Sequence, residues 1–386
     1  MSAFQKNPAA RWLVPAAALA LVAGGATLTQ AQADGGLPPK SAEELLVALQ
    51  QSKLETYSGT VSSTVDLGLG ALPVSTSRTT DFQNLANGEN TVRVWADGPT
   101  RQRIALLGQA GEADVVRNGA SVWTWNAEQQ TATHATLPAH QAKARTKPSP
   151  EKLPATPQEA AEQALAHLDP TTEVTTSGLS SVAGRDTYSL TLTPRTDKTL
   201  VQKVVLDLDG ASYAPLRVRV LSTALDKPAV DVGFTEFSTE APAASVFTFT
   251  PPKGATVKQL PAEHKAKHPA GGTVSEHPAR PSKAARPASL HVGEGWGSVS
   301  ITKVPADALT KATKPASDAP AAATDPAALL AALPTRSGAW GSGKVFEGTL
   351  FTAVLTSDGR LAVGAVPAEQ VEAALATPAA KALTAK

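Results

Sequence analysis

The chain has 386 residues, of which 42% are hydrophobic, and this is enough to bury the core of one large domain or two moderate ones. Its 35 basic and 34 acidic residues give a formal net charge of +1, so the sequence lacks the basic footprint of a nucleic-acid-binding protein. Cysteine is absent, which excludes disulfides, a thiol nucleophile, thiolate metal sites and a lipobox acylation site.

Residues 1–33 have the three parts of a secretory signal peptide. Lys6 and Arg11 give a positive start, residues 12–23 form an apolar run, and an A-x-A cleavage site ends at Ala33. The apolar run is short against the roughly 20 residues that span a bilayer. A cleaved signal peptide is therefore favoured over an uncleaved N-terminal anchor, and the sequence predicts an exported, extracytoplasmic protein.

Two capping boxes mark the starts of helices. Ser41 with Glu44, and Thr156 with Glu159, have the spacing in which a hydroxyl accepts from the backbone amide of the acidic residue. The carboxylate in turn accepts from the backbone amide of the capping residue. Pro157 suits the first position of the second helix. We expect helices to about residue 53 and to about residue 168, each with an apolar surface to cover.

The residues between these helices have the pattern of antiparallel strands. Apolar and polar residues alternate over 57–67 and over 91–137, with residues 68–90 as a loop between them. Asn118-Gly119 is a strong hairpin signal, because a type I′ turn needs positive φ at both central residues. This turn predicts that residues 114–117 pair with residues 121–125.

Four more one-sided strands follow the second helix, around residues 188–192, 204–208, 216–220 and 230–234. Their alternation predicts a sheet with one covered face and one wet face. With the first meander, the total is roughly ten strands, a number at which twisted sheets curl. The predicted fold class is α+β: a strongly curved antiparallel sheet, a half-open β-barrel, with helices covering its concave face.

This meander resembles the core of the LolA superfamily, which includes LolA, RseB and the mycobacterial lipid carriers LppX and LprG. The resemblance rests on DGPTRQR from Asp97 and ADVVRNGASVWTWNAEQQTATHATL from Ala113, and it continues at VAGRDTYSLTLTP from Val182 and DVGFTEFSTEAPAASVFTFTPPKGATV from Asp231. It covers roughly residues 40–257. It implies an incomplete barrel that is plugged by helices and loops and accepts acyl chains in its cavity.

The sequence departs from that family at the first hairpin. Lipoprotein-carrying LolA typically has a basic residue directly before the proline, whereas here Gly98 precedes Pro99 and the nearest basic residues are Arg101 and Arg103. The resemblance therefore does not extend to the hand-off chemistry of LolA itself.

Composition divides the mature chain into three parts. Residues 34–257 are expected to form the LolA-like half-barrel domain, and residues 258–290 are a linker rich in Pro, Ala, Lys and His. Residues 291–386 contain a strand, a hairpin that turns at Asp358-Gly359, and a terminal helix. Because a lone hairpin is marginal in water, this part should dock on the main sheet or form a small second domain.

The motifs of common enzymes are absent where a strand meets a helix, including the nucleophile elbow, the P-loop and the Rossmann glycines. His264 and His268 have the spacing of two metal ligands on a helix, but the neighbouring prolines favour a solvated linker pair. Four aspartates are expected at turns or strand ends, where they serve the backbone: Asp97, Asp207, Asp209 and Asp358. We predict no enzyme activity and no cofactor.

The candidate site is an apolar, ligand-binding cavity under the helices. Its expected valines are small and leave space inside a barrel of this size. The three tryptophans of the meander are either ordinary core aromatics or part of the lining. The predicted lining residues are Trp95, Trp123, Trp125, Val61, Val65, Val204, Leu206, Val218, Val220, Val232 and Phe234.

We interpret the chain as a secreted, non-enzymatic carrier that binds a lipid or the acyl chains of a lipoprotein. One alternative is an RseB-like envelope-stress sensor that regulates an anti-sigma factor, or another membrane-protein partner, through protein contacts. Another is a structural module of the envelope whose cavity is filled by its own side chains. Nucleic acid is not an expected partner.

Overall fold

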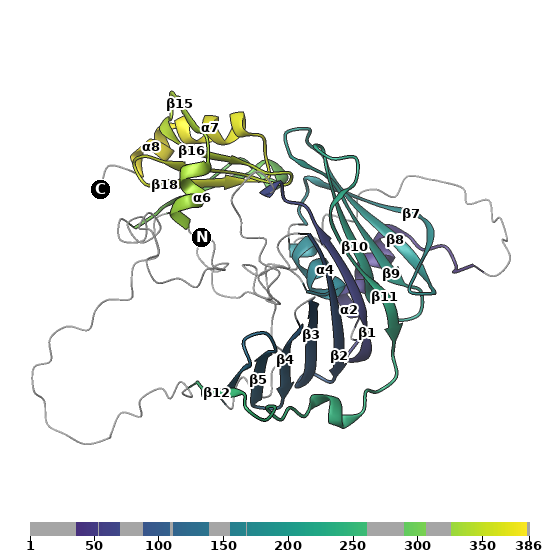
Figure 1. Ribbon diagram of the computed structural model, residues 1–386. Helices are drawn as coiled ribbons and strands as arrows, with labels where there is room; N and C mark the ends of the chain where they lie inside the picture. The colour runs from purple at the N-terminus through teal and green to yellow at the C-terminus, as the bar shows by residue number, and fades with distance from the viewer. Residues whose placement is uncertain are drawn as a thin grey trace, which may run out of the picture.

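The computed structural model describes residues 36–52, 54–69, 88–108, 111–138, 155–166, 168–260, 289–305 and 326–383. The predicted signal peptide, the His264–His268 pair and most of the predicted linker lie outside these ranges. Within them, the chain forms two sheets with a few short helices, which is the predicted α+β class (Figure 1). None of the helices in the described ranges is long and apolar enough to cross a bilayer.

Twelve strands form the large sheet, in the order β12-β6-β5-β4-β3-β2-β1-β11-β10-β9-β8-β7. They are β1 (Thr56–Val65), β2 (Gly88–Asp97), β3 (Arg101–Gly108), β4 (Gly111–Asn118), β5 (Ser121–Asn126), β6 (Thr131–Thr136), β7 (Thr172–Val182), β8 (Arg185–Pro194), β9 (Val201–Asp209), β10 (Pro215–Ser222), β11 (Pro228–Ser238) and β12 (Thr256–Gln259). All neighbours are antiparallel except β12, which lies parallel to β6. The edges are β12 and β7, and the strong curvature of a half-barrel stays a prediction.

Strand β1 joins the two halves of this sheet, because it pairs with β2 on one side and with β11 on the other. The β1–β11 pair has a bulge between Thr60 and Val61. Gly59, next to this bulge, permits the close approach: a Cβ there would overlap the Glu236 carbonyl oxygen and lie 2.8 Å from the Phe234 ring.

The predicted hairpin between β4 and β5 is present, since Asp114 pairs with Trp125 and Asn118 with Ser121. The turn itself differs from the expected type. Its two central residues are Gly119 and Ala120, and only Gly119 has positive φ, at 61°. Glycine at the first central position is the pattern of a type II′ turn, which also matches the twist of the strands.

Two helices pack on the large sheet, α2 (Ala42–Gln51) and α4 (Pro157–Ala166). The first capping box is complete, with both the Ser41 and the Glu44 hydrogen bonds in place. The second differs from the prediction: Thr156 accepts from Glu159 N at 3.2 Å, but the Glu159 carboxylate accepts from Ala155 N at 2.9 Å.

The second sheet has six strands, in the order β13-β14-β18-β17-β16-β15. These are β13 (Ser289–Val292), β14 (Val299–Lys303), β15 (Thr335–Gly338), β16 (Gly341–Glu347), β17 (Thr352–Thr356) and β18 (Arg360–Gly364), with α6 (Pro326–Ala332), α7 (Ala368–Ala376) and α8 (Pro378–Ala382). Residues of α7 and α8 share a buried core with β14, β16, β17 and β18. The predicted hairpin is β17–β18, and Gly359 takes a φ of 84° at its turn.

The second sheet docks at one end of the large sheet (Figure 1). Leu200 N and Thr199 Oγ1 donate to Ala365 O at 2.8 and 2.7 Å. Thr349 Oγ1 donates to Asp66 O at 2.5 Å, just beyond β1. Trp296, in the short 3-10 turn η6 (Gly295–Gly297), donates from Nε1 to Thr172 Oγ1 at 2.8 Å. The two sheets are therefore joined by specific polar contacts.

Candidate functional site

The candidate site is the helix face of the large sheet, which we define as the face that α2 and α4 cover. Directly paired residues of antiparallel strands point to the same side of a sheet. Val61 pairs with Val92 and Phe234, and Val218 pairs with both Leu206 and Val232. These pairs make one apolar face that runs from β2 to β9.

Eight of the eleven predicted lining residues lie on this helix face: Val61, Val65, Val204, Leu206, Val218, Val220, Val232 and Phe234. Seven are buried, and Val220 is half-buried against the same core. Side chains from the two helices pack directly on this face. The valines therefore contact protein side chains, as expected for a structural module whose cavity is filled by its own side chains.

The two helices are held differently. Helix α2 inserts Leu45 and Leu49, which are 0% and 5% exposed, against β7 and β8. Helix α4 contacts β10 and β11, and its buried residues are Pro157, Ala160 and Ala161, of which the two alanines belong to this core. An alanine methyl buries far less apolar area than a leucine side chain. Helix α4 is thus the weaker of the two covers.

The three predicted tryptophans lie on the other side of the sheet. Trp95 pairs with Ser58 and Arg103, and it follows Val94, a buried residue of the helix face. Trp123 pairs with Val116 and Trp125 pairs with Asp114, so both tryptophans lie on the same face as Trp95. The tryptophans therefore cannot line one cavity with the valines. The period of two shows which residues share a face, but it does not show which face the helices cover.

Trp123 and Trp125 pack under the segment that connects β11 to β12. Phe249 of this segment lies 5.4 Å from the Trp123 ring and 6.1 Å from the Trp125 ring, between centroids. Phe247, in the short turn η5 (Ala244–Phe247), is 1% exposed and contacts β3 and β4. We call residues 239–260 the strap. Beneath the strap, Trp125 is buried and Trp123 is half-buried.

Trp95 lies beside a charged cluster on the same outer face. The guanidinium groups of Arg93 and Arg103 lie 5.2 and 5.6 Å from the Trp95 ring centroid. Arg103 also donates to Asp114 Oδ1 at 2.8 Å and to Glu112 Oε1 at 3.1 Å. Burial raises the pKa of Asp114 to about 6, because desolvation and the nearby Glu112 outweigh the favourable contact with Arg103.

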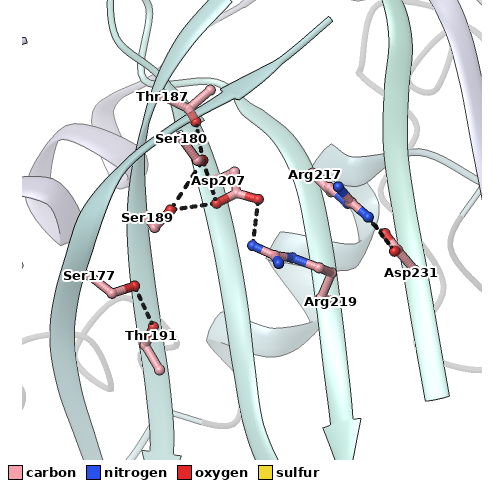
Figure 2. Close-up of polar contacts among 9 residues, drawn as sticks. All are labelled: Ser177, Ser180, Thr187, Ser189, Thr191, Asp207, Arg217, Arg219 and Asp231. Atoms are coloured by element: carbon pink, nitrogen blue, oxygen red, sulfur yellow. Dashed lines mark hydrogen bonds and ion pairs between the residues drawn. The ribbon is translucent and has the colours of Figure 1, made fainter. Parts of the chain in front are cut away.

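A buried polar network lies on the outer face of the other half of the sheet (Figure 2). Asp207, 1% exposed, accepts from Ser189 Oγ at 2.6 Å, from Ser180 Oγ at 3.2 Å and from Arg219 Nη2 at 2.9 Å. Ser180 is in β7 and Asp207 is in β9, so this bond links the edge strand β7 to β9 across the intervening strand β8. The prediction that this aspartate serves a turn was wrong, because its partners are side chains inside the sheet.

The arrangement of these polar groups is that of a structural network. Its hydroxyls donate to a carboxylate that a guanidinium already neutralises, and no imidazole within the described ranges joins them as a base. Asp209 is similar: burial alone would raise its pKa, but two bonds from Arg185 and two from Ser212 hold the pKa below its ordinary value. The part of the chain that the structure describes contains no cluster of three metal-ligating side chains.

Sequence reasoning missed a pocket between the two sheets. It has a volume of about 430 Å³ and is open to solvent. One wall is formed by loops next to β7, β8 and β9, with Pro170, Thr171, Arg195, Thr196 and Lys198. The other wall is formed by the connection between β13 and β14, with Gly293, Glu294 and Gly297, and by Gln370 of α7. No local sequence pattern could have shown it, because even the nearest residues of its two walls, Lys198 and Gly293, are 95 positions apart in the chain.

No family model and no curated protein matches the sequence. Among solved structures, the chain is similar to the MucA/MucB complex of Pseudomonas aeruginosa, at 18% identity over 86% of this chain and 96% of that chain, with a TM-score of 0.41. It is also similar to LprF from Mycobacterium bovis, at 12% identity over 57% of this chain and 100% of that chain, with a TM-score of 0.30.

A LolA superfamily protein from Nitrosomonas europaea, NE2245, matches at 11% identity over 55% of this chain and 99% of that chain, with a TM-score of 0.24. The matches thus include the superfamily that the sequence resembles.

Proposed function

We propose that this chain is a non-enzymatic binding protein of the cell envelope that takes the acyl chains of a lipid or lipoprotein onto the helix face of its large sheet. In this proposal the sheet curves into the half-open barrel that the sequence predicts, and α4 yields to the ligand. The predicted signal peptide supports a place outside the cytoplasm. The observation that carries the proposal is the continuous valine-rich face under a helix whose buried side chains are small: Pro157, Ala160 and Ala161.

Apolar burial sets the scale of this exchange. The methyl groups of Ala160 and Ala161 contribute roughly 0.8 kcal/mol each, about 1.6 kcal/mol together, and buried Pro157 with half-buried Ala164 and Leu165 adds to the burial that holds α4. An acyl chain that buries about ten methylenes gains near 8 kcal/mol before the costs of ordering it are subtracted. The gross gain from an acyl chain therefore exceeds the contribution of these two alanines, and once the ordering costs are subtracted binding should be at most moderately tight.

Uptake of a fluorescent fatty-acid or lipopeptide probe by the full chain tests the proposal. We expect uptake by the wild type, together with faster amide hydrogen exchange in α4, because the ligand displaces this helix. Val218→Trp should abolish uptake, since the indole would occupy the space of the ligand, and should cost roughly 1–3 kcal/mol of stability.

The matched control is Val205→Trp, because Val205 is also buried in the same sheet but precedes Leu206 and so points to the other face. This variant should be destabilised to a similar degree and still take up the probe. If the wild type takes up no probe, the acyl-binding proposal fails.

A second candidate function is RseB-like regulation of a membrane partner through protein contacts. It is favoured by the edge of the large sheet at β12, which among the described residues pairs on one side only and where Val257 and the following Leu260 are 46% and 56% exposed. Exposed apolar residues on an unpaired edge strand invite the addition of a partner's strand. Val257→Lys should abolish capture of a membrane partner under this reading and leave acyl-probe uptake unchanged.

A further inference from the structure

We propose that the pocket between the two sheets binds the phosphate of an anionic lipid headgroup, through Arg195, Lys198 and Thr196. This inference rests on the proposed acyl-binding function and adds a polar subsite to it. The pocket's volume of about 430 Å³ is within the range of small-molecule sites. Its place at the border of the apolar core, and the charges on its rim, indicate the class of ligand.

The cationic rim is one short loop between β8 and β9. Arg195 and Lys198 are exposed, and within the described ranges neither forms an ion pair with a carboxylate. Thr196 Oγ1 accepts from Lys198 N at 3.2 Å, which leaves its proton to donate. Guanidinium, ammonium and hydroxyl donors are the usual partners of a phosphate group. Glu294, on the opposite wall, is the one acidic residue among the lining residues.

The apolar core begins directly beneath this loop. Leu192, near the end of β8, is 0% exposed, and Val201, at the start of β9, is 6% exposed. Both belong to the core that includes Val204, Leu206 and Val218 of the helix face. A molecule with its anionic group at the loop would therefore have its apolar part next to the helix face. This matches an amphiphile better than a free anion.

The second sheet supplies the other wall and covers the core at this border. Trp296 and Ala365 pack against the core of the large sheet, and the Trp296 indole is fixed by its bond to Thr172. On the pocket wall, Gly297 has open space where a side chain would lie. A headgroup can thus approach the backbone here, and Trp296 lies close enough to report its binding by fluorescence.

Two matched probes test the proposal on the full chain: short-chain dihexanoyl phosphatidylglycerol below its micelle concentration, and dihexanoylglycerol, which has the same acyl chains without the phosphate. Calorimetry with each gives a ratio of the two dissociation constants. We expect the wild type to prefer the phospholipid by about tenfold or more. In Arg195→Gln/Lys198→Gln this preference should fall to near unity, with dihexanoylglycerol binding unchanged.

The control variant is Lys253→Gln/Lys258→Gln, which removes the same charge from the exposed strap and should keep the preference. Binding of both probes with no preference would overturn the headgroup site and leave the acyl-binding function standing. Binding of neither probe would overturn both. Full competition by equimolar inorganic phosphate would show a free-anion site instead. Binding of an acidic peptide, but no lipid, that is lost in the Arg195/Lys198 variant would make the pocket a peptide site and refute the proposal.

Discussion

Replacing Arg360 should unfold the second sheet selectively. This side chain, 2% exposed, lies at the centre of that unit: it donates to Leu375 O at 3.1 Å, to Trp340 O at 2.9 Å and to both Asp358 oxygens at 2.9 and 3.0 Å. In Arg360→Met, two buried carbonyl groups lose their donors at roughly 1–3 kcal/mol each. We therefore expect a loss of about 3–5 kcal/mol, which is a large part of the stability of a small domain.

Calorimetry and urea unfolding followed by circular dichroism should show this loss as an early transition, with the transition of the large sheet unchanged. The control is Arg336→Met, because Arg336 is 41% exposed and pairs with Glu347 and Glu372 near the surface, so its loss should cost below about 1 kcal/mol. If Arg360→Met unfolds within 1 kcal/mol of the wild type, the reasoning from its buried hydrogen bonds is refuted.

Three further outcomes follow from named residues. The pKa of Asp114 is raised to about 6, so its contribution to the free energy of unfolding should be largest below about pH 4 and should fall by up to roughly 3 kcal/mol as the pH rises through 6. Asp114→Asn should flatten that part of a pH–stability curve. An unchanged curve in this variant would contradict the raised pKa. Gly295→Ala should loosen the docking of the second sheet, since Gly295 has a φ of 51° and a Cβ there would overlap the Thr171 hydroxyl, whereas Gly297→Ala should be neutral; equal Trp296 fluorescence in both variants would argue against this contact. Limited proteolysis should cut first within the predicted linker 258–290, beyond the residues of β12 that pair with β6, and should leave a stable core from about residue 40 to the end of β12; full protection of the whole linker would contradict this prediction.

Local chemistry made the helices and hairpins predictable. Ser41 and Glu44 are three residues apart, so their mutual hydrogen bonds can be predicted from local sequence alone. The Asn118–Ser121 hairpin depends on a two-residue turn and two alternating flanks, which are also local. The turn type was wrong because Gly119 alone supplies the positive φ, and asparagine was not needed for it.

The remaining features depend on contacts that are distant in the sequence. Strand β7 was missed because TEVTTSGLSSV is mostly serine and threonine, and its place is fixed by bonds such as Ser180 to Asp207. Strand β12 was missed because all four of its residues are exposed, so it has no apolar alternation. The three tryptophans were grouped with the valines, although they lie on the opposite face of the sheet. What covers that face is the strap, with Phe247 and Phe249, and the strap is distant from the meander in the sequence.

The position of β1 has a consequence for the order in which the molecule can fold. The hairpins of β2 to β6 are local and can close within microseconds. The free edge of β1, however, waits for β11, whose residues lie more than 160 positions later in the chain, as in the Val65–Val230 pair. Proteins rich in such distant pairings fold slowly, and an unpaired strand edge is a site for aggregation until it closes. Refolding of the chain from denaturant should therefore be slow and sensitive to protein concentration.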